Sequence, residues 1–257
     1  MRTSERRTAR PIGAQRAVCG ALAALAVVGG CAAQRAAATP EASAIRHTVS
    51  ESTQLVPAAG PGSTWLLAGV RREIWIARDG SGRLAQSYSG AAGADAAEDA
   101  EWIARGRPKP AGPALDERFG PGGLLYVSLD DFPADADTVA KRLTNPAASA
   151  GEVLRRASSL LSETVPAPAV VDGVILALRK IEGVLFEETA DRLTVSAADT
   201  GDPRGTIVTL VFDKATHRLV GERRVATRLI DGLSPAALPI SLLDQRITLS
   251  EVVDAIP

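Results

Sequence analysis

Residues 168–228 decide the fold, and they read PAVVDGVILALRKIEGVLFEETADRLTVSAADTGDPRGTIVTLVFDKATHRLVGERRVATR. In the first part, apolar side chains recur at helical spacing after Pro168, a residue that can open a helix. Gly183 then stands where a helix would stop. The pattern predicts a helix over residues 169–181, with an apolar stripe of Val170, Val171, Val174, Ile175, Leu178 and Ile181.

The rest of this stretch predicts strands. Short apolar runs at 184–188, 192–197, 206–212 and 218–228, and a later one at 245–253, are separated by turn clusters such as residues 199–203. Consecutive short strands of this kind favour an antiparallel meander.

Two of these strands carry different patterns. At 206–212 both faces are apolar, which predicts a strand covered on both sides; one face holds Val208, Leu210 and Phe212, the other Ile207 and Val211. At 218–228 charged residues alternate with apolar ones, so one side is expected to face water; these are Glu222, Arg224 and Arg228 against Leu219 and Val225.

Upstream, residues 65–77 and 83–89 flank Asp79-Gly80-Ser81-Gly82, which predicts a β-hairpin. A short helix is expected from Asp135 to about Leu143, and Ser149 with Glu152 forms a capping box ahead of another. The predicted fold class is α+β, with an antiparallel, curved sheet made of the N-terminal hairpin and the C-terminal meander, packed on two or three helices.

Residues 45–257 are expected to form a single domain with a long Gly/Ala/Pro-rich loop at about 90–123. We interpret this loop as a surface excursion pinned by Trp102, with a ligand-covering lid as the alternative.

The N-terminus predicts export. Five arginines in residues 1–16 precede an uncharged apolar run at 17–28, and Gly29 and Gly30 stand before Cys31. This arrangement is typical of a secretory signal, and the run is shorter than the roughly 20 residues of a spanning helix. Val28-Gly29-Gly30-Cys31 resembles the bacterial lipobox, which predicts cleavage of residues 1–30 and acyl chains such as palmitate on Cys31. In the alternative, Cys31 is only a small residue near an ordinary cleavage site.

Residues 31–44 then form a flexible tether that holds the domain at the outer face of the cell membrane. Cys19 would leave with the signal, so the mature chain would keep Cys31 alone and form no internal disulfide. It would carry 24 basic and 29 acidic side chains, a balance that argues against nucleic acid as a partner.

Several ordered motifs between about residues 64 and 256 resemble an actinobacterial family of exported proteins of unknown function. They include Arg72-Glu73-Ile74-Trp75-Ile76, Phe119-Gly120-Pro121-Gly122-Gly123-Leu124, Phe132-Pro133-Ala134-Asp135-Ala136-Asp137, Ile181-Glu182-Gly183-Val184, residues 212–219 and Ser250-Glu251-Val252-Val253-Asp254. The family has Gly where His217 and Glu251 stand here, and the resemblance implies no catalytic residues. At the level of fold it is similar to lipoprotein-carrier and envelope-stress-sensor domains.

The residues predict no catalytic, metal or cofactor site. His47 and His217 are too far apart for metal-ligand spacing, and His217 is interpreted as a turn residue with positive φ. Asp130 and Asp131 are adjacent, so in extended chain their side chains point to opposite sides. Gly120-Pro121-Gly122-Gly123 lacks the Lys-Ser/Thr of a phosphate loop.

The sequence therefore favours a non-catalytic, membrane-tethered interaction or sensing module, with an unknown protein partner or lipid ligand. The alternative is a carrier of an apolar, acyl-chain ligand in a concave sheet, for which Val171, Val174, Ile175, Leu178 and Trp102 are the candidate surface. We favour the interpretation that the helical stripe is core, because such stripes are usually buried.

Replacing Cys31 tests the anchor. Cys31→Ser should release the protein from the membrane fraction, because stable attachment depends on the acyl chains that only cysteine accepts. Cell fractionation with an immunoblot measures this. A Cys31→Ser protein that stays in the membrane fraction as fully as wild type would show that another element anchors the chain.

Overall fold

The structure is a computed structural model that describes residues 45–60, 64–111, 114–123, 135–144, 148–162, 166–233 and 238–257. All of these residues belong to one compact unit at 39–257. The predicted signal at 1–30, Cys31, the tether and Asp130-Asp131 lie outside the described residues. Within the described ranges, no helix is both long and apolar enough to cross a bilayer.

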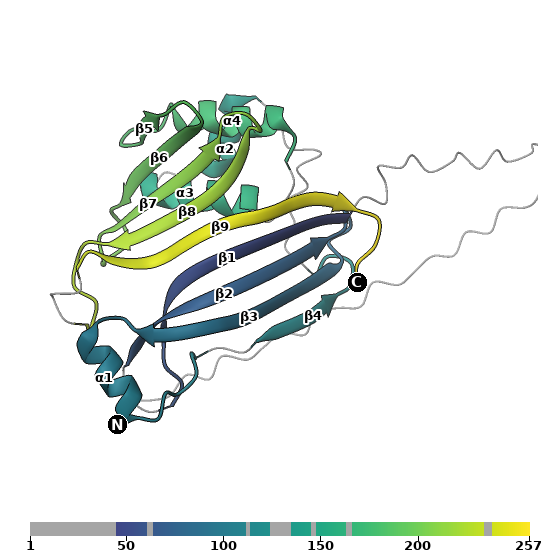
Figure 1. The fold of residues 1–257 in the computed structure, drawn as a ribbon. Helices are drawn as coiled ribbons and strands as arrows, with labels where there is room; N and C mark the ends of the chain where they lie inside the picture. The colour runs from purple at the N-terminus through teal and green to yellow at the C-terminus, as the bar shows by residue number, and fades with distance from the viewer. Residues whose placement is uncertain are drawn as a thin grey trace, which may run out of the picture. The chain divides into compact units, whose positions relative to one another are not determined.

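The described strands form one antiparallel sheet, which confirms the predicted α+β class (Figure 1). Across the sheet the strands follow the order β4 (Leu115–Phe119), β3 (Gly82–Gly93), β2 (Trp65–Ile76), β1 (Ile45–Pro57), β9 (Ile240–Val253), β8 (Arg218–Ala226), β7 (Thr206–Asp213), β6 (Arg192–Asp199) and β5 (Leu185–Glu188).

The predicted hairpin and meander are both present in this sheet. β2 and β3 pair antiparallel with Ile76 opposite Gly82, and Gly80 in the connecting turn has φ of +78°. β5 to β8 follow one another in sequence and in space, each paired with the next. β9 then pairs with β8 on one side and β1 on the other, so it joins the two halves of the sheet.

Four described helices accompany the sheet: α1 (Ala96–Ala104), α2 (Ala136–Leu143), α3 (Ala150–Ser162) and α4 (Pro168–Leu178). The predicted start signals are confirmed for α2 and α4. The Asp135 side chain accepts a hydrogen bond from the Thr138 amide at 2.9 Å, and Pro168 occupies the first turn of α4, where its missing N–H costs nothing.

The main hydrophobic core lies between these helices and the β6–β8 region of the sheet. α3 packs on β6, β7 and β8, α4 packs on β8, and α2 packs on α4. From the helices, Val171, Val174 and Leu178 are fully buried, and Ile175 packs against the same cluster. From the sheet, Val195, Val208, Leu210 and Phe212 are buried beneath them.

The expectation that residues 206–212 are covered on both sides is wrong. Val208 and Leu210 are fully buried, whereas Ile207 on the opposite face is 40% exposed. The described helices of this half pack through the Val208 face, so the apolar residues at Ile207 and Val211 give a misleading pattern.

The expectation of a long loop at 90–123 is also wrong, because this segment contains the end of β3, all of α1 and all of β4. Its acidic residues form the start of a helix: the Asp95 carboxylate accepts from the amides of Ala97 and Glu98. Trp102 does anchor the segment, since its Nε1 donates to the Pro108 carbonyl at 2.8 Å.

His217 occupies the position predicted for it. Its φ is +50°, in the left-handed region where non-glycine residues are uncommon, within the turn between β7 and β8. Its Nδ1 lies 2.6 Å from a carboxylate oxygen of Asp172 on α4, so the turn also contacts a helix.

Truncating the stripe of α4 tests its contribution to the core. Leu178→Ala should lower the free energy of unfolding by about 2–5 kcal/mol, because a fully buried side chain leaves a cavity. Leu176→Ala is the control on the same helix, since Leu176 is 53% exposed, and should change stability by less than about 0.5 kcal/mol. Denaturant unfolding measures both, and equal effects would contradict the assignment.

Candidate ligand-binding cleft

The candidate site begins with an irregularity in β8. Phe212 is opposite Leu219 and Val211 is opposite Gly221, so Val220 is an extra residue in this pairing. An inserted residue reverses which side chains face inward beyond it. Glu222 is therefore only 5% exposed, and the expectation that it faces water is wrong.

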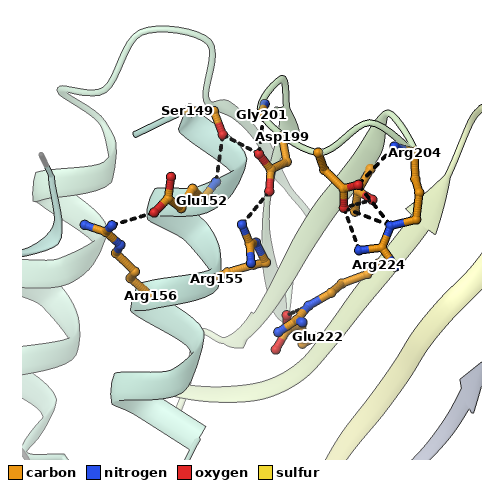
Figure 2. A network of polar contacts seen from close by, with 11 residues as sticks. Ser149, Glu152, Arg155, Arg156, Asp199, Gly201, Arg204, Glu222 and Arg224 are labelled. Atoms are coloured by element: carbon orange, nitrogen blue, oxygen red, sulfur yellow. Dashed lines mark hydrogen bonds and ion pairs between the residues drawn. The ribbon is translucent and has the colours of Figure 1, made fainter. Parts of the chain in front are cut away.

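Buried Glu222 connects α3 to the sheet. The Ser158 hydroxyl of α3 donates to one carboxylate oxygen of Glu222. Nε of Arg224 donates to the other, and Figure 2 shows this pair. A buried carboxylate needs such partners, because transfer from water without them costs several kcal/mol. The side chains of Glu222 and Arg224 thus form a fixed charged pair at the edge of the core.

A second buried carboxylate, Asp199 at the end of β6, holds the beginning of α3. It is 2% exposed, accepts from the Ser149 hydroxyl at 2.6 Å and forms an ion pair with Nη2 of Arg155 at 2.7 Å. The contact requires Gly151, where a Cβ would lie 2.4 Å from the Asp199 amide nitrogen. These interactions fix Arg155 on the side of α3 that faces the sheet's centre.

The predicted capping box is present in part. The Ser149 hydroxyl accepts from the Glu152 amide at 3.1 Å, as a capping residue should. The Glu152 side chain instead forms an ion pair with Arg156 one turn further along α3.

The turn before β7 supplies a third charged pair. Nε and Nη2 of Arg204 donate to the two carboxylate oxygens of Asp202, and the Thr206 hydroxyl donates at 2.7 Å. The hydrogen bond from Arg204, more than any other contact, holds the pKa of Asp202 far below its ordinary value. Asp202 in turn raises the pKa of Arg204. Both groups therefore stay charged at neutral pH.

A cleft of about 350 Å³ is lined by five of these side chains, those of Arg155, Asp202, Arg204, Glu222 and Arg224. Its floor is the face of the sheet where Glu222 of β8, Gln245 of β9 and Ser52 of β1 lie opposite one another in register. Fourteen of its twenty lining residues are polar: Thr48, Ser50, Ser52, Gln54, Arg72, Arg155, Ser159, Ser162, Asp202, Arg204, Thr206, Glu222, Arg224 and Gln245. The apolar remainder is Leu55, Trp65, Ile74, Ile230, Leu242 and Leu243.

The residues predicted for an apolar ligand surface are not brought together at this cleft. Val171, Val174 and Leu178 lie in the core, and Trp102 lies in α1, which packs on β2 and β3. None of them lines the cleft.

The two histidines are also separate. His47 stacks on Trp75 with ring centroids 4.6 Å apart and lies 3.1 Å from Glu251, whereas His217 contacts Asp172. Among the described residues, no three His, Cys, Asp or Glu side chains are grouped to hold a metal ion.

Sequence reasoning missed the cleft, although one signal was present. Thr48, Ser50, Ser52 and Gln54 alternate along β1, and all four line the cleft. A run of small polar side chains at a period of two predicts a hydrated face of a strand. Neither models of known protein families nor curated proteins match this chain. The resemblance to the actinobacterial family stays a prediction.

Acid unfolding tests the Asp202 pair. A carboxyl whose pKa is lower in the folded than in the unfolded chain contributes stability above the ordinary pKa, about 3.9, and loses it as pH falls toward the folded value. Asp202→Asn should lower the free energy of unfolding at pH 7 by about 1–3 kcal/mol. Its deficit relative to wild type should shrink below about pH 4.

Asp191→Asn is the matched control, because the Asp191 side chain is 77% exposed and should give little difference at any pH. Thermal unfolding monitored from pH 2 to pH 7 measures both variants. A deficit of Asp202→Asn that is constant over this range would show that Asp202 acts without its charge.

Proposed function

We propose that the chain is a non-catalytic binding module that recognises a polar ligand in the cleft between α3 and the centre of a curved sheet. Lipid on Cys31 would hold it at the outer face of the membrane. The observation that carries the proposal is the lining: fourteen of twenty residues are polar, in a cavity at the lower end of the size range of small-molecule sites.

The cleft is built in a way that suits binding. Arg224 and Arg155 are held by carboxylates that are themselves fixed, since Glu222 is 5% and Asp199 2% exposed. Side chains held in place lose little conformational entropy when a ligand binds, which favours affinity. The hydroxyls of Ser50, Ser52 and Ser159 in the same lining offer further hydrogen bonds.

An acyl-chain carrier is less well supported by the same residues. The stripe on α4 that would have contacted an acyl chain is buried in the core. Six apolar residues in the cleft lining do not form the mostly hydrophobic wall that such a ligand requires.

The experiment is mass spectrometry of small molecules that co-purify with the full-length protein in mild detergent. Ser159→Trp fills the cleft from α3, at an exposed position that removes no core side chain. Leu176→Trp places the same bulk on an exposed position of α4 outside the cleft. A polar compound should accompany wild type and Leu176→Trp and be lost from Ser159→Trp.

Two other outcomes would overturn the proposal. Acyl lipids that are lost from Ser159→Trp alone would favour the carrier. An identical set of compounds from all three proteins would show that the cleft binds nothing.

A further inference from the structure

The charge of the cleft contrasts with that of the chain. The whole sequence carries a formal net charge of −1, yet the lining has four arginines against two carboxylates. Including Asp199, which pairs with Arg155 from outside the lining, still leaves positive charge in excess. A concave surface with more positive than negative groups favours anionic ligands.

The hydrogen-bonding groups point to the same kind of ligand. The carboxylates already accept bonds: Glu222 from Ser158 and Arg224, and Asp202 from Arg204 and Thr206. A guanidinium has five N–H donors, and one carboxylate engages only some of them. Arg155, Arg204 and Arg224 therefore each keep donors beyond those given to their partner carboxylates, and the cleft suits a ligand rich in acceptors.

The placement of the arginines favours a tetrahedral anion. They enter the cleft from different elements, Arg155 from α3, Arg204 from the turn before β7 and Arg224 from β8. A planar carboxylate is satisfied by the parallel bonds of one guanidinium, whereas phosphate oxygens accept bonds from several directions.

We propose that the cleft binds a phosphate ester whose remaining part carries hydroxyl groups. Arg155, Arg204 and Arg224 hold the phosphate, and Ser50, Ser52 and Gln245 contact the hydroxyl-bearing part. This inference rests on the proposed function and specifies its ligand class. The phosphate ester is either a soluble small molecule or the headgroup of a membrane lipid, since both present the same chemistry.

The test is isothermal titration of the full-length protein with glycerol 3-phosphate, with acetate and the neutral disaccharide trehalose as comparisons. Glycerol 3-phosphate should bind most tightly, and raised salt should weaken it. Arg224→Gln and Arg204→Gln should each weaken binding about tenfold or more, the loss expected for one charge-assisted hydrogen bond.

Arg223→Gln is the matched control for charge. Arg223 neighbours Arg224 in β8 but is exposed and absent from the cleft lining, so its loss should change affinity less than about twofold. Arg224→Gln removes a partner of buried Glu222 and can destabilise the fold. Arg204 is half-exposed, so Arg204→Gln is the second variant that tests binding in that case. Thermal unfolding of each variant checks folding.

The outcomes separate this inference from the proposed function. Equal weakening by Arg223→Gln and Arg224→Gln, or no binding of glycerol 3-phosphate, would overturn the phosphate ester. If a polar compound were still lost from Ser159→Trp alone, the binding function would stand. Binding of trehalose or acetate more tightly than glycerol 3-phosphate would likewise overturn the phosphate ester and leave the binding function standing.

Vesicles distinguish the two sources of the phosphate, once glycerol 3-phosphate has bound. Cys31→Ser protein is sedimented with vesicles of phosphatidylglycerol or phosphatidylcholine, so that the anchor plays no part. Sedimentation with phosphatidylglycerol that Arg224→Gln abolishes and Arg223→Gln preserves supports the headgroup, and its absence supports the soluble ester.

Discussion

The pairing of β9 with both β1 and β8 is the constraint on which the rest of the structure depends. β1 begins at Ile45 and β9 ends at Val253, so this contact joins residues about 200 positions apart. Without it, the N-terminal hairpin and the C-terminal meander would be separate sheets. The floor of the cleft would not exist either, because Ser52, Gln245 and Glu222 are neighbours only through these two pairings.

Beside that floor, the structure changes from a hydrophobic core to a polar site within one strand. Leu219 of β8 lies in the core, and Glu222 lies in the cleft three residues later. The extra residue in β8 keeps Glu222 on the inner face, and Ser158 and Arg224 supply its hydrogen bonds. A carboxylate at this place is tolerable only with such partners, so the same contacts that stabilise the helix on the sheet also orient the arginine.

The sequence predicted features that arise from local patterns. Apolar spacing predicted α4, and turn residues predicted the β2–β3 hairpin. The tolerance of histidine for positive φ predicted that His217 lies in a turn. It did not predict features that depend on distant partners. The inward direction of Glu222 depends on a bulge that no alternation pattern reveals. Asp95 caps α1, but it stands in a Gly- and Ala-rich segment whose composition predicts a loop. The cleft was missed because its parts come from strands that are adjacent only after folding.

The alternation Asp244-Gln245-Arg246 in β9 has a consequence for how accurately the sheet must assemble. In the native register Gln245 faces the cleft beside Ser52, while Arg246 lies opposite Glu51 and Asp244 opposite Thr53 on the outer face. A slip of one position would turn a full charge of either sign inward beside Glu222 and Arg224, and would turn Gln245 outward. Gln245 therefore lines the cleft only when the final strand is aligned in the native register, at the point where the two halves of the sheet meet.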